Sequence, residues 1–429
     1  MKILVVGAGA REHALVWKLA SEPDVSSVLC APGNPGIGRL ADCRPVDPGD
    51  VDGLLALADA ESVDLTIVGP ELPLSLGLVD RFTAAGRMVF GPTAEAARLE
   101  TSKIFAKEFC ERHRVPTARF RVCDSADAAL DVIRSGEFGI PAVIKADGLA
   151  AGKGVVIAGD RAEAEAAVRA AMVDRRFGAA GARIVIEEHL QGQELSFFVV
   201  ADGHCAVPLL SAQDHKRAFD DDEGPNTGGM GAFAPSPLFT PDLHKRIMRQ
   251  IIEPVLEGMA AENRPYSGFL YAGLMLTADG PQVIEFNARL GDPEAQVVLP
   301  MIDEPLLPLL AAAVTRQLRR TGCRIRHEPH VGVVLASGGY PGPYATGHAI
   351  SGITDAEALD DVLVFQAGTA MREGRLVTAG GRVLTVVGRG PDYRQAIARA
   401  YEGVAKIEFD GMQFRRDIGR KALAPASSV

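Results

Sequence analysis

One segment, residues 140–157, constrains the fold of this chain more than any other. An apolar run from Ile140 to Ile144 ends in Lys145, and a second apolar run, Val155–Ile157, follows a glycine-rich loop with the sequence A-D-G-L-A-A-G-K-G. Two short apolar runs on either side of such a loop predict an antiparallel β-hairpin. Glycine lets the backbone approach phosphate oxygens closely and lysine supplies positive charge, so this hairpin is suited to folding over a polyphosphate.

The loop is not a P-loop. Only three residues separate Gly148 from Gly152, and Gly154 stands where that motif needs Ser or Thr. Considered alone, the segment fits a mobile surface hairpin equally well. A phosphate-binding role therefore depends on a second motif.

That second motif is Q-V-I-E-F-N-A-R-L-G-D-P-E-A-Q, residues 282–296. Residues 283–286 predict a strand, so Glu285, Asn287 and Arg289 alternate onto one face. A carboxylate and an amide oxygen are hard ligands that suit Mg²⁺, and an arginine on the same face can hold a carboxylate or phosphate by two parallel hydrogen bonds. A half-buried strand with a polar solvent face is the alternative, and the acidic turn Gly291-Asp292-Pro293-Glu294 makes it less attractive.

Length and composition limit the class of protein. A chain of 429 residues is too long for one core and predicts roughly two to four domains. The net charge of −10 disfavours a general nucleic-acid binder, and no apolar stretch approaches membrane-spanning length. The six cysteines are scattered without paired spacing, which indicates free thiols. We therefore expect a cytoplasmic protein that binds neither nucleic acid nor membrane.

The first hundred residues alternate between strand and helix patterns, which predicts a doubly wound parallel sheet. The expected strands, residues 2–6, 27–31 and 65–68, end in the turns Gly7-Ala8-Gly9, Pro32-Gly33-Asn34 and Gly69-Pro70-Glu71. Such turns meet at the carboxyl edge of the sheet, where ligands bind. A nicotinamide site is disfavoured, because Glu12 breaks the G-x-G-x-x-G pattern and no acidic residue follows the second strand.

The remaining chain divides into three further parts. We predict domains at residues 1–102, 103–190, 191–327 and 328–429, the second of which contains the glycine-rich lid. The polar, glycine-rich segment Gln213–Met230 is too long for a simple turn, and we interpret it as a binding loop. A helix is expected over residues 241–261, and strands over residues 331–336 and 383–387.

Motifs throughout the chain resemble one family. They are G-A-R-E-H-A (9–14), A-P-G-N (31–34), I-V-G-P-E (67–71), residues 145–155, Q-D-H-K-R (213–217), G-P-N-T-G-G-M-G (224–231), G-F-L-Y-A-G-L-M (268–275), residues 285–294 and R-D-I-G (416–419). On these residues the chain resembles the phosphoribosylamine–glycine ligase (glycinamide ribonucleotide synthetase) family of the ATP-grasp superfamily. The resemblance implies an α/β ATP-grasp fold with an N-terminal doubly wound parallel-sheet domain, a small lid subdomain and a C-terminal mixed α/β domain.

The resemblance also implies a reaction. ATP phosphorylates the carboxylate of glycine, the amine of 5-phosphoribosylamine attacks the resulting glycyl phosphate, and glycinamide ribonucleotide, ADP and phosphate leave, as a step of purine biosynthesis. Mg²⁺ or Mn²⁺ is the implied metal. The implied partners are small molecules; the family suggests a monomer, with a possible transient contact to the preceding pathway enzyme.

Site residues follow from the same resemblance. Those implied to bind ATP are Lys103, Lys145, Gly152, Lys153, Gly154, Glu187, Glu188, Leu190 and Glu194. Those implied to bind the metal are Glu285 and Asn287, because the strand 271–275 offers no further acid. Those implied to bind glycine or phosphoribosylamine are Gly9, Asn34, Gly69, Pro70, Glu71, Asp214, Lys216, Arg217, Asn226, Thr227, Gly228, Gly229, Arg289, Gly291 and Asp292. The implied catalytic residues are Arg289, Lys145 and Asp214, with Asp214 on the ammonium and Arg289 on the carboxylate of glycine; no general base is evident.

Three alternatives remain at this point. Another ATP-grasp ligase or carboxylase, using formate or bicarbonate, is expected to lack the Q-D-H-K-R and G-P-N-T-G-G-M-G pair. A regulatory nucleotide-binding protein without turnover is expected to have lost Lys145, Glu285, Asn287 or Arg289. A dehydrogenase is disfavoured by the broken glycine pattern.

Overall fold

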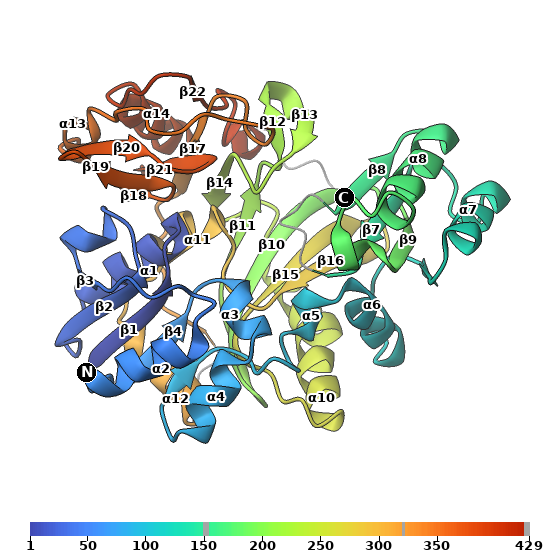
Figure 1. Cartoon of the computed structure of the whole chain (residues 1–429), viewed down its shortest axis with the longest axis horizontal. Coiled ribbons are helices and arrows are strands. Elements are labelled where there is room, and N and C mark those ends of the chain that lie inside the picture. The colour runs from blue at the N-terminus through green and yellow to red at the C-terminus, as the bar shows by residue number, and fades with distance from the viewer. Residues whose placement is uncertain (149–153, 320–321, 424–429) are drawn as a thin grey trace.

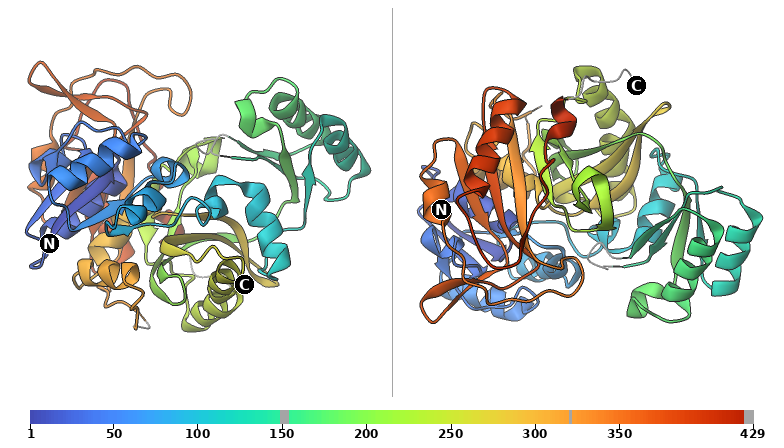
Figure 2. Two further views of the ribbon diagram at one scale, coloured as in Figure 1. Left: turned by 60° about the horizontal axis from the view of Figure 1, so that its bottom comes forward. Right: turned by 90° about the horizontal axis from the view of Figure 1, so that it is seen from above.

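The computed structural model describes residues 1–148, 154–319 and 322–423. An N-terminal parallel sheet, a lid with its own sheet, and a large antiparallel sheet make up the molecule (Figure 1). The lid projects away from the rest, and Figure 2 shows the same separation from two further sides. Gly152 and Lys153 of the expected lid loop lie outside the described residues.

The N-terminal sheet is five-stranded and parallel, in the order β3-β2-β1-β4-β5. Its strands are β1 (Lys2–Gly7), β2 (Ser27–Pro32), β3 (Asp42–Cys43), β4 (Leu65–Val68) and β5 (Val89–Phe90), with helices α1 (Ala10–Ala20), α2 (Val51–Ala60), α3 (Glu71–Ser75) and α4 (Leu78–Ala84) between them. Residues 3–6 of β1 are fully buried, as expected of a strand covered on both faces. The predicted doubly wound sheet is confirmed.

The lid is a four-stranded antiparallel sheet in the order β6-β9-β7-β8, with two helices packed on it. Its elements are β6 (Phe120–Cys123), α7 (Ala126–Ser135), β7 (Ala142–Ala146), β8 (Val155–Ala158), α8 (Arg161–Met172) and β9 (Ile184–Glu188). Strands β7 and β8 pair antiparallel with Lys145 opposite Val155, which confirms the predicted hairpin. The lid has its own hydrophobic core, so it can move as a unit.

The large sheet runs without interruption from the centre of the molecule into the C-terminal part, in the order β16-β15-β10-β11-β14-β17-β21-β18. Its strands are β10 (Gln193–Asp202), β11 (Ala206–Asp214), β14 (Gly231–Ala234), β15 (Ser267–Thr277), β16 (Gly280–Asn287), β17 (His330–Ser337), β18 (Val362–Gln366) and β21 (Arg382–Arg389), with β22 (Met412–Gln413) beside β17. Pairing of β14 with β17 crosses the predicted boundary at residue 328, so both parts share one sheet.

Helices cover the faces and ends of this sheet. They are α5 (Arg98–Thr101), α6 (Lys103–Arg112), α9 (Pro241–Ile247), α10 (Glu253–Ala261), α11 (Glu294–Val298), α12 (Leu307–Val314), α13 (Ile353–Glu357) and α14 (Tyr393–Val404), and a small hairpin, β19 (Thr369–Arg372) with β20 (Arg375–Thr378), lies outside it. The continuous helix expected over 241–261 contains a π-turn, Met248–Ile252. Pro254 lacks the N–H that an α-helical bond to residue 250 needs, which is consistent with this wide turn.

The segment Gln213–Met230 is more ordered than the expected loop. It contains a second small hairpin, β12 (Arg217–Phe219) and β13 (Glu223–Asn226), joined by a short 3₁₀ turn. The prediction of a long loop was wrong in this respect, because the alternation over so few residues is too short to recognise in the sequence. Among the described residues, no helix combines the length and apolar character needed to cross a membrane.

Candidate active site

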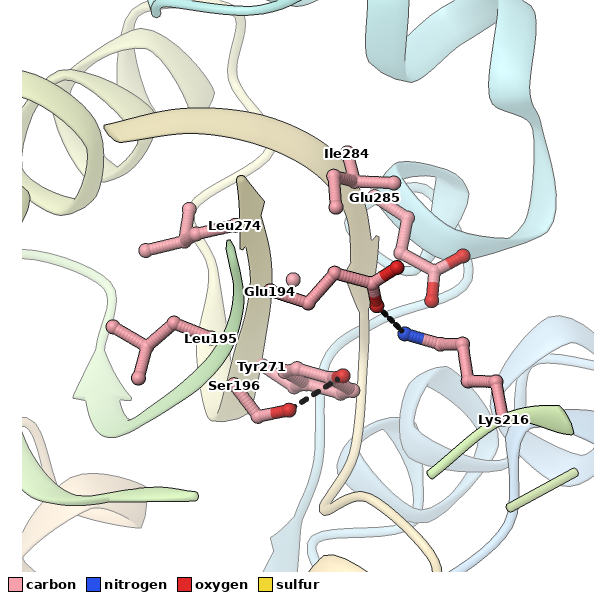
Figure 3. Close-up of a pocket in the computed structure, with 9 residues that line it drawn as sticks. Glu194, Leu195, Ser196, Lys216, Tyr271, Leu274, Ile284 and Glu285 are labelled. Carbon is pink, nitrogen blue, oxygen red and sulfur yellow. Dashed lines mark hydrogen bonds and ion pairs between the residues drawn. The ribbon is translucent and has the colours of Figure 1, made fainter. Parts of the chain in front are cut away.

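Strand β16 places Glu285 in a small pocket on the large sheet, which residues of β10 and β15 and Lys216 also line. The antiparallel register puts Glu285 opposite Gly273 and Asn287 opposite Tyr271 on β15. A side chain at position 273 would meet Glu285, since a Cβ there would lie 3.2 Å from its Cγ. Figure 3 shows Glu285 and Glu194 directing their carboxylates toward the ammonium group of Lys216.

Two lysines and one glutamate form a buried cluster beneath the lid. Lys145, on β7, donates from Nζ to the Ile284 carbonyl at 3.0 Å and forms an ion pair with Glu187 Oε1 at 3.0 Å. The other carboxylate oxygen of Glu187 lies 2.9 Å from Lys107 Nζ. Burial lowers the pKa of Lys107, and the Glu187 carboxylate opposes that effect. The cluster joins the lid strands β7 and β9 to strand β16, which carries Glu285.

Lys103 lies at the N-terminus of α6, next to the glycine-rich loop. Its Nζ donates to the Gly148 carbonyl at 3.0 Å. The Ser102 hydroxyl caps the helix by accepting from Phe105 N at 3.1 Å, and it donates to Asp147 at 3.0 Å. Burial lowers the pKa of Lys103, which the Glu285 carboxylate partly offsets. Lys103, Lys145 and the start of the loop therefore form one basic wall facing Glu285.

The connection from β9 to β10 carries the other residues predicted to bind ATP. Glu188 points to Arg119, with Oε2 2.7 Å from Nε, and also accepts from the Arg119 backbone N–H. Glu194 forms an ion pair of 2.6 Å with Lys216. Leu190 lies in this connection, two residues after β9 ends at Glu188.

Lys216 lies between two carboxylates, those of Glu194 and Asp214, the latter at 3.4 Å. Burial raises the pKa of Asp214 to about 7, against the attraction of Lys216. The structure thus places Lys216 beside Glu194, one of the residues predicted to bind ATP. Asp214 is positioned to change its protonation state near neutral pH.

Arg289 is held by two carboxylates. Its guanidinium lies 2.8 Å from Glu100 Oε1 and 3.3 Å from Glu71 Oε2, and it also donates to Asn287 Oδ1 at 3.3 Å. Burial raises the pKa of Glu100. At Glu71 burial also acts to raise the pKa, but the charges of Arg289 and Arg11 together with hydrogen bonds lower it. Arg289 therefore ties the third N-terminal turn to the end of β16. A substrate carboxylate that binds Arg289 would either share the guanidinium with Glu71 or displace the Glu71 side chain.

The three N-terminal turns converge as predicted. Asn34 donates from Nδ2 to the Ala8 carbonyl at 2.9 Å, and Gly69 N donates to the Val6 carbonyl at 3.0 Å. Between the turns lies Glu12, which accepts from Gly9 N at 2.7 Å. A Cβ at Gly9 or Gly69 would lie 2.7 or 2.3 Å from its carboxylate oxygens. This carboxylate stands at the N-terminus of α1, where the pyrophosphate of a dinucleotide binds in nicotinamide-binding folds, and so opposes that alternative.

The loop that follows β13 meets the acidic turn after β16. Arg382, on β21, donates to the carbonyls of Gly228 and Asp292 at 2.7 and 2.6 Å and pairs with the Asp292 carboxylate at 3.3 Å. Gly228 N donates to the Tyr340 hydroxyl at 3.0 Å. A Cβ on Gly229 would lie 2.4 Å from Pro293 Cδ. This contact fixes the separation of the two loops.

The other predicted substrate residues lie around these loops. Arg217 and Asn226 are opposite each other in the β12–β13 hairpin, and Thr227 donates from its N–H and its hydroxyl to the Lys216 carbonyl. Pro70 precedes α3, and a Cβ on Gly291 would lie 2.5 Å from Glu294 Oε2.

Five residues that we did not single out belong to the site's framework: Glu12, Glu100, Lys107, Tyr340 and Arg382. Two of them had a local signal: Lys107 lies one helical turn after Lys103 on the same face of α6, and Glu12 accepts from Gly9 N at the start of α1. The other three act through contacts with residues far away in the sequence.

The oxygen ligands that β16 offers suit a divalent metal ion whose remaining ligands come from a bound phosphate compound and water. In the part of the chain that the structure describes, no three His, Cys, Asp or Glu side chains are arranged to hold a metal ion. Glu285 and Asn287 supply two oxygen ligands, and Mg²⁺ is commonly held by one or two side chains together with phosphate oxygens and water. The basic wall and the glycine-rich hairpin provide the complement for the polyphosphate.

Comparison with known proteins defines first the class and then the family. Residues 101–295 match the ATP-grasp (A) domain of phosphoribosylglycinamide synthetase, so the class is that of the ATP-grasp enzymes. Residues 1–100 match the N domain and residues 330–421 the C domain of the same enzyme. The chain belongs to the phosphoribosylglycinamide synthetase family.

Full-length relatives agree. The chain is 52% identical over 428 residues to a phosphoribosylamine–glycine ligase of Xanthomonas axonopodis pv. citri, covering 99% of this chain and 98% of the relative. It is 50% identical over 427 residues to the phosphoribosylamine–glycine ligase of Pseudomonas aeruginosa, covering 99% of both chains.

Solved structures confirm the fold. The crystal structure of phosphoribosylamine–glycine ligase from Thermotoga maritima matches with a TM-score of 0.84 and 33% identity, covering 97% of this chain and 100% of that one. The biotin carboxylase domain of a Hydrogenobacter thermophilus 2-oxoglutarate carboxylase matches with a TM-score of 0.73 at 16% identity, which shows a shared fold alone.

Proposed function

We propose that this enzyme, an ATP-using carbon–nitrogen ligase, joins glycine to 5-phosphoribosylamine and forms glycinamide ribonucleotide, ADP and phosphate. The observation that carries the proposal is the basic wall of Lys103 and Lys145 facing Glu285, combined with full-length membership of the family. The reaction is the glycine ligation step of purine biosynthesis. A glycyl phosphate is the intermediate, because a free carboxylate is a poor electrophile.

Lys103 and Lys145 hold the phosphates of ATP from one side. The lid hairpin, including Gly152, Lys153 and Gly154, closes over the phosphates from the other side and excludes water. Glu187 keeps Lys145 in place through its buried ion pair, and Leu190 and Glu188 flank the base. Glu194, the partner of Lys216, meets the ribose.

Glu285 and Asn287 would hold a divalent cation, which we propose to be Mg²⁺. A cation held there would supply positive charge to compensate the phosphates during phosphoryl transfer. Every other contribution comes from the chain, which acts mainly by positioning the reactants and by compensating charge.

Glycine binds between Asp214 and Arg289. The Asp214 carboxylate accepts from the ammonium group, and the Arg289 guanidinium binds the carboxylate that receives the phosphoryl group. Gly228 and Gly229 leave space for a small substrate only. The carboxylates of Glu71 and Glu100 keep Arg289 charged and oriented.

Phosphoribosylamine binds where the N-terminal turns meet the loop after β13. The residues that we assign to it are Gly9, Asn34, Gly69, Pro70, Glu71, Lys216, Arg217, Asn226, Thr227, Gly291 and Asp292. Its neutral amine attacks the carbonyl carbon of the glycyl phosphate, and phosphate leaves with the bonding electron pair. The amine nitrogen gives up one proton as the amide forms, which the departing phosphate can accept, and we assign no base from the protein to this step.

We further propose that the enzyme is a cytoplasmic monomer that receives its unstable amine substrate through a transient contact with the enzyme that makes it. The small-molecule substrates and the absence, in the described residues, of a helix able to span a membrane are consistent with this setting.

ADP release tests the proposed function. The enzyme is supplied with Mg-ATP, glycine and phosphoribosylamine formed in situ from ribose 5-phosphate and ammonia, and each component is omitted in turn. We expect ADP release to require both glycine and the amine, and Glu285→Ala to abolish it. Release without glycine, or with another carboxylate preferred, would contradict the substrate assignment.

A further inference from the structure

The β12–β13 hairpin carries Arg217 and Asn226 but is a weak unit by itself. Its ladder joins only Arg217 to Asn226 and Phe219 to Glu223, with an irregularity between them. A two-stranded hairpin of this size is marginally stable in water. The tip is also strained, because Asp221 and Asp222 have φ values of 56° and 57°, in the left-handed region that favours glycine. The hairpin therefore needs support from elsewhere in the molecule.

That support comes from the C-terminal segment Arg415–Lys421. The Arg415 side chain is fully buried, and its guanidinium donates to Asp222 Oδ1 at 2.8 Å and to the Arg217 carbonyl at 3.2 Å. It also forms two hydrogen bonds of 2.8 and 2.6 Å with Asp417. Asp417 in turn accepts from Asp221 N at 3.0 Å. One buried arginine thus joins the tip of the hairpin to its base.

Further contacts of the same segment fix the remaining tip residues. Arg416 N donates to Asp220 at 2.7 Å, and Lys421 forms an ion pair of 2.7 Å with Asp222. Burial alone would raise the pKa of Asp222, but hydrogen bonds from Lys421 and Arg415 lower it, so this carboxylate stays charged. Two of the three successive acids at the tip, Asp221 and Asp222, are therefore paired with cations of the C-terminal segment, whereas Asp220 accepts from the Arg416 backbone N–H.

The C-terminal part holds the same loop at its other end, through the contacts of Arg382 and Tyr340 with Gly228. Between the two anchored ends lie the residues assigned to the substrates. Lys216 directly precedes Arg217, and Arg415 donates to the Arg217 carbonyl. The Lys216 carbonyl accepts two hydrogen bonds from Thr227. A shift of the hairpin would consequently move Lys216 out of its position between Glu194 and Asp214.

We propose that Arg415 is a positioning residue of the ligase. Through Asp222 and the Arg217 carbonyl, it fixes the hairpin so that Lys216 and the loop 226–229 face the substrates. The planar, permanently charged guanidinium suits this task, since it satisfies acceptors on three sides at once. The inference rests on the proposed function.

A matched pair of substitutions at the tip tests the proposal. Asp222→Asn removes one of the two anionic partners of buried Arg415 and leaves Asp417, whereas Asp221→Asn removes the partner of Arg420, in a pair whose side chains are 65% and 75% exposed. Both variants lose one charge, and asparagine tolerates the left-handed backbone at both positions. Lys421→Ala is a second control, because it removes only the other partner of Asp222.

We expect kcat/KM for glycine and for phosphoribosylamine to fall at least tenfold in Asp222→Asn and less than twofold in Asp221→Asn and Lys421→Ala. All three variants should remain folded at the assay temperature, and the KM for ATP should change less than that for glycine. Equal kinetics in the two Asp→Asn variants, or a loss of activity that follows the loss of thermal stability, would overturn the positioning role. Wild-type enzyme without glycine-dependent ADP release would instead refute the proposed function.

Discussion

At the scale of single residues, the cluster of Lys107, Lys145 and Glu187 determines how the lid meets the floor of the ATP site. All three side chains are less than a tenth exposed. A buried charge is tolerated only when it is paired, and removal of one member leaves the others uncompensated. Among the residues that the structure describes, Glu187 is the one carboxylate that both lysines contact at ion-pair distance, so its loss should cost most.

We predict that Glu187→Gln lowers the free energy of unfolding by about 3–5 kcal/mol, the usual cost of leaving a buried ion pair without one partner. It should also weaken ATP binding, because Lys145 loses its orientation. Glu188→Gln is the control: its pair with Arg119 is exposed, and exposed pairs contribute about 1 kcal/mol or less. Urea unfolding of both variants measures the difference. Equal losses of unfolding free energy in the two variants would contradict the claim that Lys107, Lys145 and Glu187 form a buried, paired cluster.

A second residue-scale prediction concerns Asp214, whose pKa is raised by burial to about 7. Only the ionised form accepts from the ammonium group of glycine, so acidification through pH 7 should lower kcat/KM for glycine. We expect this value, measured with saturating amine and ATP, to rise with pH through about 7 and to level off above it. Asp214→Asn should be slow and should lose this rise. If kcat/KM for glycine rose with pH in the same way in Asp214→Asn, the pH dependence would belong to another group.

At the scale of elements, the sequence was informative where the pattern is local. The hairpin of β7 and β8 was predictable, because two apolar runs and a glycine-rich loop specify it within eighteen residues, 140–157. The period of two in residues 283–289 likewise placed Glu285 and Asn287 on one strand. The β12–β13 hairpin was not predictable, because Arg415, about two hundred residues further along, holds it.

The same distinction applies to the candidate site. Lys103, Lys145, Glu285 and Arg289 were recognised from motifs, and the structure brings them together. Glu100 and Arg382 were missed, because each acts on a partner remote in sequence, Arg289 and Asp292 respectively. Charged residues in ordinary local contexts give no indication of such pairing.

The close packing of two loops at Gly229 leads to an element-scale prediction. Gly229 has a φ of 111°, and a Cβ there would collide with Pro293. Gly229→Ala should therefore combine backbone strain with overpacking, and should lower kcat/KM for glycine by displacing the acidic turn. Gly86→Ala is the matched control, because Gly86 also has a positive φ, 74°, but has open space around it.

We expect Gly86→Ala to cost about 1 kcal/mol of unfolding free energy, and Gly229→Ala about 1–3 kcal/mol more. Urea unfolding and glycine kinetics of the two variants provide the comparison. Equal costs with unchanged kinetics would mean that the two loops separate easily.

At the scale of the whole molecule, the C-terminal part docks on the N-terminal sheet through buried polar contacts. His13 Nδ1 accepts from Gln366 N at 2.8 Å, and Asn34 donates to the Gln366 carbonyl at 2.8 Å. Burial, helped by Arg39, lowers the pKa of His13 to about 4. A histidine that is neutral in the folded protein stabilises it above its unfolded pKa of about 6.5, and this stabilisation is lost as the pH falls toward the folded pKa.

We therefore predict that acidification from pH 6.5 to 4.5 removes the contribution that His13 makes to the free energy of unfolding. Asp214 acts in the opposite direction, because its raised pKa favours the folded state as the pH falls. His13→Asn keeps an acceptor for Gln366 but cannot ionise. Between pH 6.5 and 4.5 its free energy of unfolding should therefore fall less than that of the wild type, the difference being on the order of 2 kcal/mol. If the free energy of unfolding of His13→Asn and of the wild type changed identically with pH, His13 would make no such contribution. His204→Asn, at an exposed position, is the control.

The central claim is that this molecule activates the carboxylate of glycine by phosphorylation between the lid and strand β16. It is tested most directly by glycine labelled with ¹⁸O in its carboxylate, supplied with ATP and phosphoribosylamine. We predict one ¹⁸O atom in each inorganic phosphate released, because the oxygen that receives the phosphoryl group leaves with it. Phosphate without ¹⁸O would show that the carboxylate is never phosphorylated and would contradict the account.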